Sequence, residues 1–118
     1  CLDYFKVVTK DDAPSARIQA EYDKQFPGNI VFAAGSAATG MYRGLKLWEA
    51  AVKEAKSVNR DAVAKALDHA RISEGPGGPA EMVPGKRHCK MRMYTAVAKG
   101  GTYELVARSK GLVDPKEC

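Results

Sequence analysis

The feature that most constrains the fold of this chain is a long amphipathic segment over residues 35–56. It begins with small residues and then carries apolar side chains at steps of four and three, which places them on one face of a helix. The opposite face is charged. The spacing predicts a helix of about five turns whose apolar face is buried against a large partner surface. The apolar face consists of Met41, Leu45, Trp48, Val52 and Ala55, and the charged face of Lys46, Glu49, Lys53 and Lys56.

Two shorter helices are predicted on either side of this segment. Residues 13–26 follow Asp11 or Asp12 as the N-cap and have Pro14 in the first turn. Residues 60–70 follow Asn59, which is also a favourable N-cap. Because the link between the long helix and the helix at 60–70 is short, we expect these two to pack as a pair. The apolar faces are Ile18, Tyr22 and Phe26 in the first helix, and Val63, Ala66, Leu67 and Ala70 in the other.

The predicted strands are short. Residues 4–9 are rich in aromatic and β-branched side chains, and residues 30–33 form a brief apolar run that is either a strand or the lead-in to the long helix. A turn-rich connector at residues 74–79 precedes a predicted strand at 80–83. A hairpin follows, with strands at residues 91–99 and 102–108 joined by Gly100-Gly101, a pair typical of a two-residue turn.

This order of elements predicts a mixed α/β fold with three helices, short strands and a C-terminal hairpin. The 118 residues are 45% hydrophobic and 28% charged, which is usual for a globular chain, and the net charge is +5. No apolar run approaches the ~18 residues that a membrane-spanning helix needs. The few strands offer little sheet for so much helical surface, so we expect part of the sheet to lie outside this chain.

No catalytic, metal-binding or cofactor-binding constellation is apparent. Gly35 and Gly40 have the spacing of a phosphate-binding loop, but the lysine of that motif is missing. Neither His69 nor His88 has a second ligand at metal spacing. The sequence therefore predicts a protein that is not an enzyme and needs no metal or cofactor.

The chain has three cysteines, namely Cys1, Cys89 and Cys118. Because this number is odd, at least one thiol is free or paired between chains.

The densest basic cluster runs from Lys86 to Arg92, with Tyr94 just beyond it. A basic groove beside an aromatic ring is one arrangement that binds single-stranded nucleic acid or an acidic partner. A solvated loop that enters a hairpin explains the same residues, and no RNA-binding or helix-turn-helix signature is present. An interaction module for nucleic acid or an acidic partner is therefore the alternative hypothesis, and nucleic acid is not the expected partner.

The ordered set of motifs resembles one known family. The set comprises the helix that ends Tyr22-Asp-Lys-Gln-Phe26-Pro-Gly, the run Met41-Tyr-Arg-Gly-Leu-Lys-Leu-Trp-Glu-Ala-Ala51, the following helix, Pro76-Gly-Gly, His88 and the final hairpin. It resembles the C-terminal third of type I periplasmic substrate-binding proteins. These extracellular ligand-binding receptors serve ABC transporters for branched-chain amino acids, urea or short amides.

The resemblance implies a fold and a place within it. The family has two Rossmann-like lobes that close on a ligand, and its members are roughly three times as long as this chain. The chain is therefore expected to be a fragment that contains partial lobes. Residues 35–71 would then be a helical segment of the first lobe, and residues 1–34 and 72–118 would be segments of the second.

The resemblance also implies a site, a location and partners. The ligand pocket of the family lies between the lobes, beside the start of the long helix, which maps onto Ala37, Ala38, Thr39 and Tyr42. The expected ligand is an amino acid, urea or an amide, the expected partner is an ABC transporter permease, and the expected location is periplasmic. An isolated fragment is expected to form a homo-oligomer, because its apolar helix face would otherwise remain in water.

Overall fold

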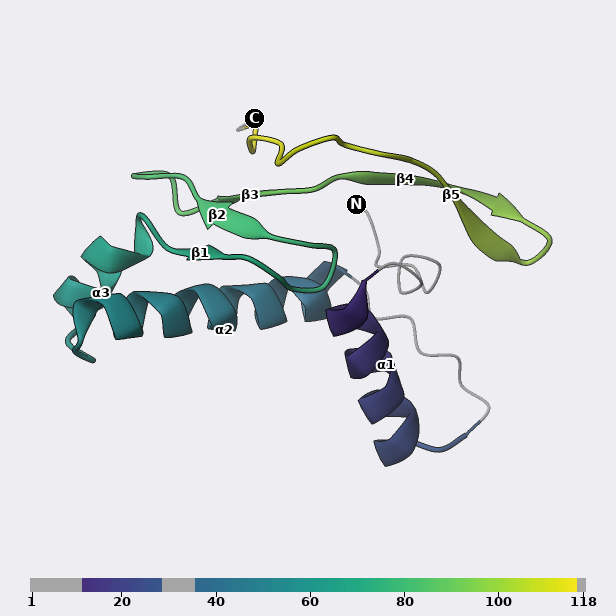
Figure 1. The fold of residues 1–118 in the computed structure, drawn as a ribbon, viewed down its shortest axis with the longest axis horizontal. Coiled ribbons are helices and arrows are strands. Elements are labelled where there is room, and N and C mark those ends of the chain that lie inside the picture. The colour runs from purple at the N-terminus through teal and green to yellow at the C-terminus, as the bar shows by residue number, and fades with distance from the viewer. Residues whose placement is uncertain (1–11, 29–35, 117–118) are drawn as a thin grey trace.

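The computed structural model describes residues 12–28 and 36–116, and its helices lie in the first part of the chain. Helix α1 spans Ala13–Gln25, α2 spans Ser36–Ala55 and α3 spans Arg60–Leu67. In Figure 1, α1 projects away from the long helix α2, whereas α3 lies at the far end of α2. All three predicted helices are confirmed, and α3 ends three residues earlier than predicted. The predicted strands at residues 4–9 and 30–33 lie outside the described residues.

The strands of the described residues form two small antiparallel sheets. One has the order β1-β2-β3, with β1 at Arg71–Ile72, β2 at Ala80–Met82 and β3 at Cys89–Met91. The other is a hairpin of β4, Tyr94–Lys99, and β5, Thr102–Arg108. Figure 1 shows the three-stranded sheet running above α2, and the hairpin extending beyond it. The α/β class and the C-terminal hairpin are thus confirmed.

The hairpin turn forms for the reason that the sequence indicates. Lys99 pairs with Thr102, so Gly100 and Gly101 are the two turn residues. Their φ angles are 57° and 76°. Positive φ at both positions favours glycine and matches the twist of the flanking strands. The prediction of one continuous strand over residues 91–99 was wrong, because the strand breaks between β3 and β4, where β3 pairs with β2 and β4 pairs with β5.

The predicted helix pair is confirmed by a shared core. Asn59 caps α3, since its Oδ1 accepts hydrogen bonds from the backbone N–H groups of Asp61 and Ala62 at 3.1 and 3.2 Å. The side chains of α3 then pack against α2, and partly buried residues of β1, β2 and β3 complete this core. Its buried members are Leu47, Ala51, Val63, Ala66 and Ala70. Three of these five are alanines, so the core is small for the length of α2.

The predicted buried face of α2 requires a correction. The residues that the described part of the chain buries lie at steps of four, namely Thr39, Arg43, Leu47 and Ala51. Most of the predicted face points elsewhere, because Met41 is 67% exposed, Leu45 58% and Trp48 51%. Only the C-terminal members of that face, Val52 and Ala55, pack against the core.

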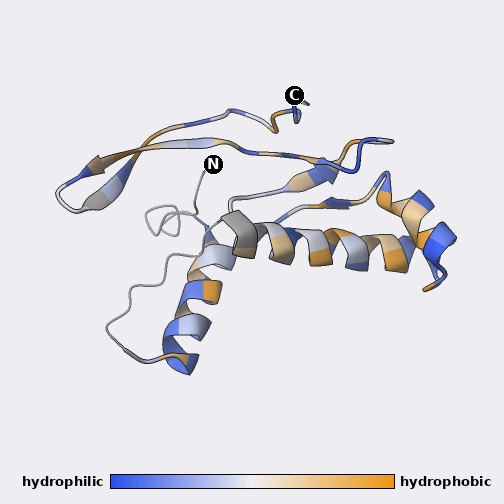
Figure 2. Ribbon diagram, turned by 180° about the vertical axis from the view of Figure 1, so that it is seen from behind, coloured by the Kyte–Doolittle hydropathy of each residue, from blue (hydrophilic) through white to orange (hydrophobic). Residues whose placement is uncertain are grey.

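The physical reason for this correction is that α2 has apolar residues around much of its circumference. Figure 2 shows hydrophobic residues at intervals along α2, whereas α1 is mainly hydrophilic. The sheet of short strands covers only one side of the helix. We call the exposed set Met41, Leu45 and Trp48 the outer stripe.

Similarly, the predicted apolar face of α1 is only partly covered: Ile18 and Tyr22 are half-buried, but Phe26 is 62% exposed. None of the described helices is long and apolar enough to cross a membrane.

Candidate functional site

The start of α2 meets α1 and the hairpin at one loop, the connector of residues 74–79. The backbone N–H of Gly77 donates to Asp12 Oδ2 at 2.6 Å, just before α1. Arg43 Nη2 donates to the carbonyl oxygen of Pro76 at 2.7 Å, and Tyr94 Oη donates to that of Gly77 at 2.7 Å. Three segments that are distant in sequence are therefore held by the backbone of one short loop.

Local sequence explains how the connector and α1 reach this geometry. Gly77 and Gly78 have φ angles of 80° and 102°, a region that favours glycine. Asp12 occupies the predicted N-cap position of α1, but its carboxylate does not accept a helix amide. It accepts hydrogen bonds from the hydroxyl of the buried Ser15 and from the backbone amide of Gly77 instead. The position of the cap was predictable from the sequence, and its distant partner was not.

A cavity of about 350 Å³ lies beside this junction. It is bounded by the start of α1, the charged face of α2, β1 and the beginning of the connector, and we call it the polar cavity. Tyr42 is half-buried in its wall. Four basic side chains and two acidic ones line it, so the surroundings favour a ligand with an anionic group. The charged lining residues are Arg17, Lys46, Lys53, Arg71, Glu49 and Glu74.

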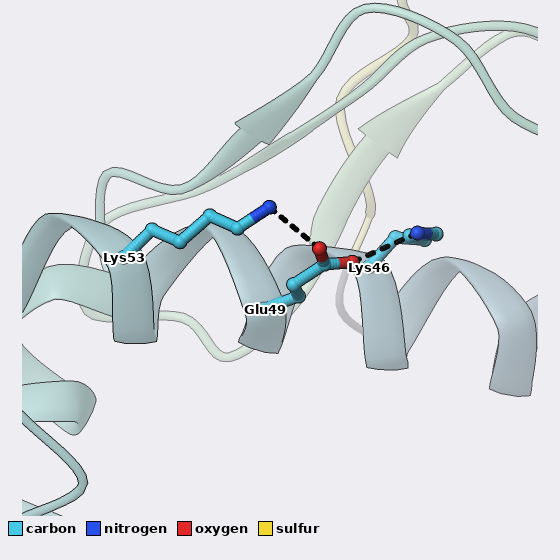
Figure 3. Close-up of polar contacts among 3 residues, drawn as sticks. All are labelled: Lys46, Glu49 and Lys53. Carbon is cyan, nitrogen blue, oxygen red and sulfur yellow. Dashed lines mark hydrogen bonds and ion pairs between the residues drawn. The ribbon is translucent and has the colours of Figure 1, made fainter.

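Glu49 lies between two of these lysines, as Figure 3 shows. Its carboxylate oxygens accept hydrogen bonds from Lys46 Nζ at 2.8 Å and from Lys53 Nζ at 2.6 Å. The hydrogen bonds from Lys46 and Lys53, and then the two positive charges, lower the pKa of Glu49 from 4.5 to about 2. The hydrogen bond and the charge of Glu49 raise the pKa of Lys46. Three residues of the charged face, Lys46, Glu49 and Lys53, are therefore joined by exposed ion pairs at the i,i+3 and i,i+4 spacings of a helix.

We expect the Glu49 carboxyl to titrate near pH 2 rather than near pH 4.5. A pKa that is lower in the folded state stabilises the protein above the unfolded-state value, and this contribution is lost as the pH falls from about 4.5 towards 2. An NMR titration of the Glu49 side chain measures this. The double substitution Lys46→Met and Lys53→Met is the control, which should raise the midpoint. A midpoint near 4.5 in the unsubstituted chain would contradict the network.

Of the three predicted site residues whose side chains the structure describes, only Tyr42 lies in the wall of the polar cavity. Tyr42 lines it, whereas Thr39 is buried, with 7% exposed, and Ala38 is exposed; neither is among the lining residues. Ala37 lies in the first turn of α2, and its side chain is outside the described part of the structure. Sequence reasoning missed Arg17 and Arg71, because nothing in their local sequence indicates that their segments meet.

The predicted basic cluster is divided between different surroundings. Lys86, Arg87 and His88 are exposed in the turn between β2 and β3. Lys90, on β3, pairs with Asp114 at 3.1 Å, and the side chain of Arg92 lies against Gly78 in the connector. Within the described residues, no group of three His, Cys, Asp or Glu side chains is arranged to hold a metal ion. Cys89 is a free, half-buried thiol on β3.

Comparison with known protein families finds one family that this chain matches. Residues 3–102 match the periplasmic binding protein family, a range that includes all three helices and the junction around the connector. The chain therefore belongs to the periplasmic binding protein family. A search of curated proteins found no match. Membership supports a solute-binding rather than a catalytic role, and a periplasmic or extracellular location.

Proposed function

We propose that this chain is part of the solute-binding component of an ABC transporter. In this proposal two lobes close on a small polar ligand, such as an amino acid, urea or an amide, and the complex delivers the ligand to a membrane permease from the periplasm. The observation that carries the proposal is the family match over residues 3–102. The mainly basic lining of the polar cavity is consistent with a ligand that carries a carboxylate.

We also propose that the lobes divide the chain as the resemblance implies, with residues 35–71 in the first lobe and residues 1–34 and 72–118 in the second. The Cα radius of gyration supports an incomplete globule: it is 15.8 Å, whereas a globular domain of this length has about 13.5 Å. Ile72 of β1 and Met82 of β2 pack against the core of α2. In this division, residues 72–118 of the second lobe therefore contact the first-lobe helix through β1 and β2. The outer stripe is then the face that further parts of the first lobe cover.

The proposed ligand contacts are Ala37, Ala38, Thr39 and Tyr42, at the start of α2. The test uses the product of the whole reading frame that contains this chain, with a panel of amino acids, urea and short amides. A true ligand at about one hundred times its Kd should stabilise the protein by about 2.7 kcal/mol, which raises the unfolding midpoint. Tyr42→Ala should reduce this shift, whereas Tyr103→Ala, at a half-exposed position on β5, should not.

The 118-residue chain alone should bind no member of this panel tightly, because half of a cleft leaves most of a ligand's surface in water. If no member of the panel shifts the midpoint of the whole product, the solute class is wrong. If the isolated chain binds one at micromolar concentration, the proposed division into partial lobes is wrong. The two failures are therefore distinguishable.

The outer stripe leads to an expectation about assembly. Exposed apolar surface costs about 25 cal/mol per Å², so the isolated chain should form a homo-oligomer that buries Leu45 and Trp48. Sedimentation equilibrium at micromolar concentration measures this. Leu45→Lys should shift the population towards monomer, and Val106→Lys, at an equally exposed position on β5, should not. An unsubstituted chain that remains monomeric would contradict the expectation.

A further inference from the structure

The buried guanidinium group of Arg43 has no counter-charge among the residues that the structure describes. Arg43 is 9% exposed, and it donates to the carbonyl oxygen of Pro76 and, at 3.5 Å, to the sulfur of Met91. None of the ion pairs within residues 12–28 and 36–116 includes it. A guanidinium has five N–H donors, so several have no acceptor from this part of the chain. Since burial of an unpaired charge is unfavourable, an anion beside Arg43 would stabilise the site.

Arg43 lines a second cavity, which lies between α2, the end of α3 and the turn before β3. Its volume is about 430 Å³, within the range of roughly 300–1,000 Å³ for small-molecule sites. Among the described residues that line it, none is Asp or Glu, and none lines the polar cavity. We call it the arginine cavity. Its apolar walls are formed by Leu47, Leu67, Met82 and Met91.

Two further features make the arginine cavity accessible to a ligand. Gly40 and Gly44 border it from α2, and a Cβ atom added at either position would meet no atom within 4 Å. The backbone of α2 therefore faces open space there. Arg87 and His88 line the cavity from the exposed β2–β3 turn, so a second positive side chain lies near its entrance.

We propose that the arginine cavity binds a small organic carboxylate that has an apolar body and no ammonium group, because the described lining carries positive side chains and no acidic partner for an ammonium group. The carboxylate pairs with the Arg43 guanidinium, because the planar fork of arginine matches the two oxygens of a carboxylate. The apolar body packs on Leu47, Leu67 and Met82. This site goes beyond the proposed solute site, since it uses another cavity and all its lining residues belong to this chain.

The test is an NMR titration of the 118-residue chain with benzoate. Saturable shifts of the Gly40 and Gly44 amide signals are expected, because both residues border the cavity. Benzyl alcohol, which has similar size and no charge, should bind at least about tenfold more weakly, as expected for the loss of a hydrogen bond between charged groups. Inorganic phosphate, which has charge but no apolar body, should also bind more weakly than benzoate.

Two substitutions remove the site in independent ways. Arg43→Met removes the charge and should weaken benzoate binding about tenfold or more. Gly44→Met fills the cavity and should weaken it similarly; it should also fold well, because methionine has a higher helix propensity than glycine and the added side chain enters open space. The control is Arg60→Met, since the Arg60 side chain is 92% exposed and does not line the cavity. It should leave the affinity within about twofold.

Several results would overturn the proposal. One is the absence of saturable shifts at Gly40 and Gly44. Another is benzoate affinity that is unchanged in Gly44→Met, which decides the question even if Arg43→Met fails to fold. Equal affinity for benzyl alcohol would show an apolar pocket without a role for Arg43. Equal or tighter binding of phosphate would show a general anion site and would refute the assignment to organic carboxylates.

Discussion

Leu47→Ala should lower the free energy of unfolding by about 2–5 kcal/mol, the range measured for leucine truncation in packed cores. Leu47 is 3% exposed and lies at the centre of the core that α2 shares with α3. Truncation leaves a void among neighbours such as Val63 and Ala66, which the backbone of α3 holds in place, so they cannot all move into it. Urea unfolding followed by circular dichroism measures the change as a lower midpoint.

The matched control for this prediction is Leu45→Ala. It is the same substitution, two residues away on the same helix, but Leu45 is 58% exposed. Measured at a concentration low enough to keep the chain monomeric, a surface substitution usually changes stability by less than about 0.5 kcal/mol, and alanine favours the helix. Equal shifts of the urea midpoint in the two variants would mean that the outer stripe is as well packed as the inner face, which would contradict the orientation of α2.

Asp12→Ala should be the second most disruptive change, at roughly 2–4 kcal/mol. It removes the acceptor of both the Gly77 amide and the Ser15 hydroxyl. Ser15 is 1% exposed and Gly77 is half-buried, and a fully buried donor that loses its partner costs about 1–3 kcal/mol, so most of the loss is expected from Ser15. We expect faster hydrogen exchange of the Gly77 amide and earlier proteolysis of α1, because Asp12 joins the start of α1 to the connector.

The control for Asp12 is Asp23→Ala, the same substitution near the other end of α1. Asp23 is exposed, and the one described side chain that donates a hydrogen bond to its carboxylate is that of Gln19, at 2.8 Å. Its loss should change stability by less than about 0.5 kcal/mol and leave the exchange of Gly77 unaltered. If Asp12→Ala behaves like this control, the connector is held by its other contacts alone.

The parts of the fold that local sequence determines were predictable. Asn59 caps α3 through its own side chain, and Gly100 and Gly101 form the turn of the hairpin through their own φ angles. The ion pairs of Glu49 follow from helical spacing. In each case the interacting groups are separated by a few residues, so the periodicity or chemistry of one segment is sufficient to predict them.

The parts that depend on distant segments were not predictable. The orientation of α2 is set by which side the short sheet covers, and its apolar residues permit more than one answer. Arg43 was missed because a charged residue is not expected on a buried face, although it lies four residues from both Thr39 and Leu47. In the candidate site, Tyr42 was predicted and lines the polar cavity. Arg17 of α1 and Arg71 of β1 also line it, but nothing in their sequences indicates that these two segments meet.

The connector has a consequence for how this family member can change during evolution. Its contacts with Asp12, Arg43 and Tyr94 are all made through backbone N–H and C=O groups. Substitutions that keep these residues small preserve those groups, whereas insertion or deletion of one residue moves them out of register with three separate partners. We therefore expect homologous chains to keep the length of this loop and the glycines at the positive-φ positions Gly77 and Gly78, and to vary mainly at its other positions.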